Sequence, residues 1–71
     1  MTIMKRYPVG SRLTSGGDVF ATIVRSDGAG LTLRYSHGDR DYPWESLNTW
    51  LRWPHNRIIL PFNEYINAVT N

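Results

Sequence analysis

Three tryptophans, Trp44, Trp50 and Trp53, fall within ten residues of this chain. Indole rings offer a large apolar surface and one N–H donor, and Trp, Tyr and Arg are the residues most enriched where proteins contact one another. The stretch from Arg40 to Trp53, RDYPWESLNTWLRW, holds four aromatic residues and two arginines. This composition favours non-covalent binding of a partner over chemistry on a substrate.

The residue types that most often catalyse reactions stand in unsuitable places. His37 and His55 both lie in turn-like sequence. His37 and Asp39 have no third metal ligand at a suitable spacing. The Gly28-x-Gly30 pattern joins two predicted strands, whereas a phosphate-binding loop leads from a strand into a helix. We therefore predict that the protein is not an enzyme and that it has no catalytic residues, no metal site and no cofactor.

The tryptophan-rich segment is predicted to form a helix with one buried face. At about 100° per residue, Trp44, Leu47 and Leu51 share that face and Trp50 lies at its edge. Trp53 precedes a proline and so leaves helical geometry. We expect Trp44 and Leu47 in the core and at least one indole to stay available to a partner. The predicted partner-binding residues are Arg40, Tyr42, Trp50, Arg52 and Trp53.

Arginines on two neighbouring strands support an alternative hypothesis, a small β-rich nucleic-acid-binding protein. Arg25 and Arg34 are predicted to share a polar face with Thr22 and Thr32, and Arg57 adds positive charge. Arginine beside Tyr or Trp suits phosphate contact and base stacking. The formal net charge is only +2, however, and acidic residues are interleaved with the basic ones, which weakens the positive field.

Length and composition describe one small folded domain, residues 1–71. Hydrophobic residues make up 41% of the chain and charged residues 20%, which is typical of a globular domain. There is no cysteine, as is common in a reducing cytosol. No apolar run approaches the roughly 18 residues of a membrane span, and the N-terminus does not resemble a secretory signal. We predict a cytoplasmic protein without membrane contact.

The hydrophobic pattern predicts an α+β fold. We expect strands over residues 9–14, 19–25, 31–36, 40–42 and 57–60, and helices over residues 44–52 and 64–69. Pro43 suits the first position of the first helix. The predicted architecture is a small antiparallel β-meander of about three to five strands packed with one or two short helices. The alternative is an SH3-like small β-barrel, and a real helix over residues 44–52 would favour the meander.

Two local expectations concern turns and ion pairs. Residues 26–30 read as a hairpin loop in which Gly28 and Gly30 are free to take positive φ. Asp39 and Asp41 flank Arg40, and we expect these acidic residues to form surface ion pairs.

The order of these elements resembles that of some small type I anti-CRISPR proteins of phages and mobile elements. The residues that carry the resemblance are Arg40, Asp41 and Tyr42, then Ser46, Leu47, Trp50 and Leu51, then Pro54. It covers roughly residues 18–54, while the strand over 57–60 and the helix after it depart from the pattern. No binding residue is transferred by it.

This resemblance implies a non-enzymatic inhibitor that covers a surface of a host CRISPR effector and blocks guide-directed DNA binding or nuclease recruitment. The function predicted is accordingly a phage- or mobile-element-type inhibitor that docks on a host nucleic-acid-handling complex. A third possibility is an accessory subunit that completes a larger fold, which cooperative unfolding of the isolated chain would argue against.

Overall fold

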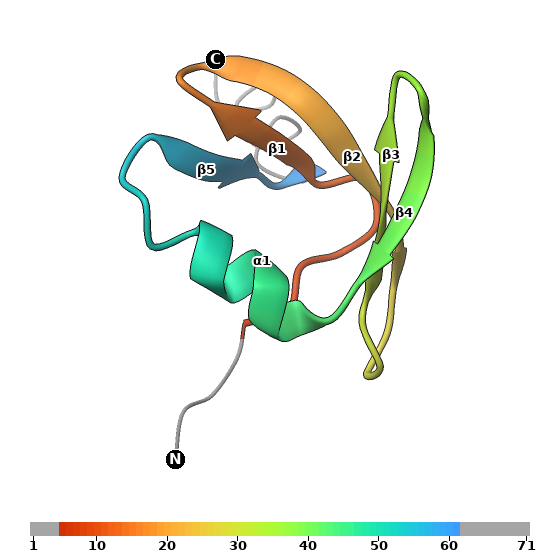
Figure 1. Cartoon of the computed structure of the whole chain (residues 1–71). Helices are drawn as coiled ribbons and strands as arrows, with labels where there is room; N and C mark the ends of the chain where they lie inside the picture. The colour runs from red at the N-terminus through yellow and green to blue at the C-terminus, as the bar shows by residue number, and fades with distance from the viewer. Residues whose placement is uncertain (1–4, 62–71) are drawn as a thin grey trace, which may run out of the picture.

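A computed structural model describes residues 5–61 of the chain (Figure 1). Its elements, in chain order, are β1 (Arg12–Ser15), β2 (Asp18–Ser26), β3 (Leu31–Tyr35), β4 (Gly38–Tyr42), α1 (Trp44–Trp50) and β5 (Asn56–Ile59). The five strands form one antiparallel sheet in the order β4-β3-β2-β1-β5. The first four strands form a meander, and α1 carries the chain across to place β5 beside β1.

The sheet is strongly curved, and α1 lies on its concave side (Figure 1). The register of β2 is irregular at two places. Against β1 it shifts between the partners of Leu13 and Thr14. Against β3 it shifts between Ile23 and Arg25. Such bulges bend a strand and increase its twist. The edge strands β4 and β5 do not pair with each other, so the sheet is not a closed barrel. The predicted α+β meander is the fold, and the closed-barrel alternative is not.

The concave face of the sheet carries the core. Leu31 and Leu33 point toward it with Tyr35, as the alternation in β3 predicts. The hydrophobic residues that are buried there and on α1 are Leu13, Ala21, Ile23, Leu31, Leu33, Trp44 and Leu47. The expectation that Trp44 and Leu47 belong to the core is confirmed.

The β1–β2 turn has a clear physical basis in its sequence. Ser15 pairs with Asp18, which leaves Gly16 and Gly17 as a two-residue loop. Both glycines have positive φ, 63° and 93°, as tight hairpin turns of the primed type require. A side chain at either position would be strained.

The first strand is shorter than predicted. It begins at Arg12 instead of residue 9, because the chain first makes a turn in which the Ser11 N–H donates to the Pro8 carbonyl at 3.2 Å. Gly10 supports that turn with a φ of 96°. Val9, predicted as a strand residue, is consequently exposed.

The β2–β3 loop differs from prediction in how its glycines are used. Neither Gly28 nor Gly30 has positive φ, so that expectation was wrong. The Asp27 carboxylate instead accepts hydrogen bonds from the N–H groups of Ala29 and Gly30, at 2.9 and 3.1 Å. Gly30 is needed for a different reason: a Cβ there would collide with the carbonyl oxygen of Tyr42.

Helix α1 spans seven residues, Trp44–Trp50, within the predicted range of 44–52. Pro43 is its N-cap residue, with extended ψ, and not the first helical residue as predicted. The helix stops at its C-cap, Leu51, and the following chain turns with the Trp53 N–H donating to the Trp50 carbonyl at 3.4 Å. Arg52 therefore lies beyond the helix.

The side chain of Asn56 links the end of α1 to β1 through two hydrogen bonds. Its side-chain amide donates to the carbonyl of Trp50 at 2.8 Å and its carbonyl accepts from the Ser15 hydroxyl at 2.9 Å. β5 accordingly starts one residue earlier than predicted and ends at Ile59. The predicted helix over residues 64–69 lies outside the described residues. No helix in residues 5–61 has the length and apolar character needed to cross a membrane.

Candidate binding pocket

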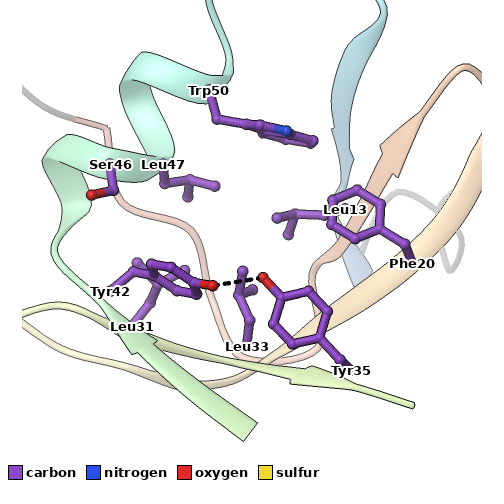
Figure 2. Close-up of a pocket in the computed structure, with 9 residues that line it drawn as sticks. All are labelled: Leu13, Phe20, Leu31, Leu33, Tyr35, Tyr42, Ser46, Leu47 and Trp50. Carbon is purple, nitrogen blue, oxygen red and sulfur yellow. Dashed lines mark hydrogen bonds between the residues drawn. The ribbon is translucent and has the colours of Figure 1, made fainter. Parts of the chain in front are cut away.

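An open pocket of about 260 Å³ lies between α1 and the concave face of the sheet (Figure 2). Strands β1 to β4 and helix α1 contribute side chains to it. The residues that line it are Leu13, Phe20, Leu31, Leu33, Tyr35, Tyr42, Ser46, Leu47 and Trp50. None of these side chains carries a charge at neutral pH, so the lining is apolar and aromatic with a few hydroxyl groups.

Aromatic rings form much of the pocket wall (Figure 2). Phe20 lies 5.6 Å from Trp50 in an edge-to-face arrangement and 6.2 Å from Tyr35 in a stacked one, measured between ring centroids. His37 stacks on Tyr35 at 5.3 Å. These distances fall in the favourable range for aromatic pairs, so the rings hold one another in place without filling the space between sheet and helix.

Phe20 reaches the pocket because of the bulge in β2. Leu13 pairs with Ala21 and Thr14 pairs with Val19, which leaves Phe20 without a direct partner on β1. Strict alternation would send Phe20 to the face opposite Ala21. The bulge allows both residues to serve the concave face, where Phe20 remains 39% exposed.

A pair of tyrosine hydroxyls is the main polar feature of the pocket. The Tyr35 and Tyr42 oxygens lie 3.0 Å apart and share one hydrogen bond (Figure 2). Burial, together with the hydrogen bond shared with Tyr42, raises the pKa of Tyr35 to about 12, against the opposing charge of Arg40. Only one of the two hydroxyl protons is used in the pair, so the other can donate to a bound group.

The raised pKa of Tyr35 predicts a stability change at high pH. Since the pKa is higher in the folded protein than the ordinary value of 10, the stabilisation is complete below pH 10 and is lost as pH rises toward 12. We expect a tyrosinate absorbance titration to show one tyrosine ionising near pH 12 together with unfolding. In a Tyr42→Phe variant its pKa should fall only part of the way to 10, because burial remains. A Tyr35 that ionises near 10 in the folded wild type would contradict this geometry.

Arg40 shares the concave face with the pocket. It pairs with Leu33 across β3 and β4, while Tyr42, two residues further along β4, pairs with Leu31. Its side chain is exposed, and its charge acts on the Tyr35 hydroxyl. Asp39 and Asp41 form the surface ion pairs that we expected, with Arg34 and Arg25 as their partners. Alternation along β4 places these carboxylates on the face of the sheet opposite Arg40.

The predicted partner-binding residues fall into two groups. Tyr42 and Trp50 line the pocket, with Arg40 on the same face of the sheet. Arg52 and Trp53 lie in the turn after α1, outside the pocket lining, where Trp53 is 60% exposed.

Sequence reasoning missed Phe20 and Tyr35 as pocket residues. Tyr35 had a usable signal, because its alternation with Leu33 already placed it on the inner face. Phe20 had none, since the bulge that turns it inward depends on the pairing of β1 with β2.

The convex face of the sheet carries the arginines proposed for nucleic acid. Cross-strand pairing places Arg34 opposite Thr22 and Arg25 opposite Thr32, so the predicted shared face is confirmed. Each arginine is paired with a carboxylate: Arg34 donates to Asp39 at 3.0 and 3.1 Å, and Arg25 contacts Asp27.

These ion pairs lower the pKa of both aspartates. The Arg25 guanidinium, with the Ala29 N–H, lowers the pKa of Asp27, and the Arg34 guanidinium lowers that of Asp39. Both carboxylates therefore stay charged and offset the arginines. Arg57, the third predicted phosphate ligand, is exposed on the edge strand β5.

The Arg34–Asp39 pair is exposed, so it should contribute little to stability. We expect Arg34→Ala to leave the urea midpoint of unfolding at low salt close to that of wild type. A large fall in the midpoint would contradict the exposed position of this pair.

Comparisons with protein-family models, curated proteins and solved structures find no match to this chain. Within residues 5–61, no three His, Cys, Asp or Glu side chains are grouped as a metal site requires. The candidate site therefore rests on the geometry of the pocket between α1 and the sheet.

Proposed function

We propose that this chain is a non-catalytic protein-binding domain and that the pocket between α1 and the sheet receives an apolar side chain of its partner. The observation that carries the proposal is an open pocket of about 260 Å³ with an uncharged lining of aromatic and leucine side chains. Burying apolar surface stabilises a complex by about 25 cal/mol per Å². Partly exposed rings such as Phe20 and Trp50 offer that surface in the free protein.

The charge distribution supports a protein partner over nucleic acid. Arg25 and Arg34 are already paired with aspartates on the convex face, and a phosphate would have to compete with those carboxylates. The nucleic-acid alternative stays a prediction that depends on Arg25, Arg34 and Arg57.

The identity of the partner is proposed from the resemblance alone. We propose a host nucleic-acid-handling complex, such as a CRISPR effector, whose working surface this protein would cover. The inhibitor would act by occupying a surface, because the proposal assigns it no reaction. The segment on which the resemblance rests includes Tyr42 and Trp50, two of the residues in the pocket lining.

Affinity capture from a host lysate tests the proposal. The full chain is immobilised as wild type, as Trp50→Ala and as Trp53→Ala, each checked for folding by circular dichroism, and the lysate is treated with nuclease. We expect a protein that wild type and Trp53→Ala retain and that Trp50→Ala loses. Capture that disappears on nuclease treatment, or that is unchanged in Trp50→Ala, would contradict the proposal.

A salt titration tests the nucleic-acid alternative separately. Phosphate contacts weaken binding steeply as salt rises, because each contact releases counterions. If the proposal is right, we expect no binding of duplex or single-stranded DNA at low salt beyond the weak level of non-specific attraction. Tight binding with a steep salt dependence, lost in an Arg25→Gln, Arg34→Gln double variant, would instead establish the alternative.

A further inference from the structure

We infer that the group which enters the pocket is an aromatic side chain of a protein segment and that this segment carries an Asp or Glu next to the aromatic residue. The inference rests on the proposed function, since it requires the pocket to be a protein-binding site. It goes further by stating what the partner must present: a ring for the pocket and a carboxylate for Arg40.

The size of the pocket suits a ring. A dry apolar cavity of roughly 150 Å³ holds a benzene molecule, so a pocket of about 260 Å³ accommodates a phenyl or indole group. A valine or alanine side chain would leave much of this volume unfilled, and the lost contacts would weaken binding.

The pocket wall also favours an aromatic occupant. Phe20 and Tyr35 are stacked on one side, and Trp50 meets Phe20 edge to face. A further ring between Trp50 and Tyr42 can adopt the same edge-to-face or offset contacts, each worth something beyond the buried area. The Tyr35–Tyr42 hydroxyl pair adds one hydrogen-bonding position, which suits an indole N–H or a backbone carbonyl of the partner.

Arg40 supplies the charge requirement. It lies on the concave face of β4, beside Tyr35, and is exposed. Within residues 5–61 it has neither an ion pair nor a side-chain hydrogen bond, whereas Arg25 and Arg34 on the convex face are both paired. A guanidinium binds a carboxylate in a planar fork. A partner segment with an acidic residue beside its ring would therefore meet a cation that is free to bind it.

A second copy of this chain fits the pocket less well. Its candidate donor is Trp53, which is 60% exposed. Trp53 follows Arg52 directly, so inserting it would bring a second positive charge toward Arg40. We therefore expect the isolated protein to be monomeric.

Selection from a phage-displayed library of random peptides tests the inference. The full chain is panned as wild type and, in parallel, as Trp50→Ala and Phe20→Ala. Phe20 is partly exposed on a bulge, so its variant keeps the test valid if Trp50→Ala does not fold. We expect peptides that wild type enriches and both variants lose to share Phe, Tyr or Trp with a neighbouring Asp or Glu.

A matched pair of synthetic peptides then measures the role of Arg40. The best selected peptide is compared with its analogue in which the acidic residue is replaced by the corresponding amide. We expect Arg40→Gln to weaken binding of the acidic peptide about three- to fivefold at low salt and to leave binding of the amide analogue unchanged. Trp50→Ala should weaken both peptides by about 30-fold.

The outcomes separate the inference from the proposed function. Pocket-dependent peptides that carry aliphatic anchors, or basic residues beside the ring, would overturn the inference and leave the binding function standing. Enrichment that does not depend on Trp50 or Phe20, or no enrichment, would overturn both. A concentration-dependent dimer that competes with the peptides would show that a second copy is the occupant.

Discussion

Replacing Trp44 by alanine is expected to lower the free energy of unfolding by about 3–5 kcal/mol. Trp44 is 5% exposed, and its indole N–H donates to the carbonyl of Asp27 at 2.6 Å. The substitution removes a large buried ring and leaves that carbonyl without its donor. A domain of this length has a total stability of only about 4–11 kcal/mol, so the substitution removes a substantial fraction of it.

Trp53→Ala is the matched control, because it removes the same side chain from an exposed position. We expect its stability to stay within about 0.5 kcal/mol of wild type. Urea denaturation followed by far-ultraviolet circular dichroism measures both variants. Equal losses in the two variants would contradict the assignment of Trp44 to the core and of Trp53 to the surface.

Replacing Gly30 by alanine is expected to cost about 2–3 kcal/mol, although the change adds a single methyl group. The added Cβ would overlap the carbonyl oxygen of Tyr42, which belongs to the backbone and so cannot swing aside. Gly30 directly precedes β3, Tyr42 is the last residue of the neighbouring strand β4, and Pro43 leads directly into α1. Relieving the overlap would shift the start of the helix relative to the sheet.

Gly28→Ala is the control within the same loop. A Cβ there meets only the end of the flexible Arg6 side chain, at an ordinary 3.6 Å. We expect its free energy of unfolding to match that of wild type within about 0.5 kcal/mol. Thermal denaturation of the two variants side by side measures the difference. A Gly28 variant as unstable as the Gly30 variant would show that the loop needs glycine for flexibility and not for space.

The strands and the first helix could be predicted because their hydrophobic patterns involve residues that are close together in the sequence. Leu31, Leu33 and Tyr35 alternate with polar residues, and their inward orientation follows directly. Trp44 and Leu47 share one helical face, and both are buried. Prolines and glycines marked most of the boundaries to within a few residues.

The pocket could not be predicted in full because it depends on contacts between distant segments. Phe20 turns inward only because β2 bulges against β1. Gly30 is required only because the end of β4 passes close to it. The pairing of Asp39 and Asp41 with convex-face arginines, and not with Arg40, follows from strand register across three strands. The amino-acid sequence alone does not show these contacts between distant segments.

The division of the arginines between two faces gives the sheet its asymmetry. On the convex face Arg25 and Arg34 are matched by carboxylates, as in Arg34–Asp39. The concave face has an aromatic pocket and one exposed cation, Arg40, without such a match in residues 5–61. The concave side thus offers a partner an aromatic pocket together with an exposed cation, and this combination is the reason we place the binding site there.

Nuclear Overhauser contacts with free indole test most directly whether the pocket is open and accepts a ring. The isotope-labelled full chain is mixed with millimolar unlabelled indole, and contacts between the two are recorded with an isotope-filtered experiment. We expect contacts from indole to the Leu47 methyl groups and to the rings of Tyr35 and Trp50, and none to Trp53. Contacts confined to Trp53, or none at saturating indole, would contradict an open pocket between α1 and the sheet.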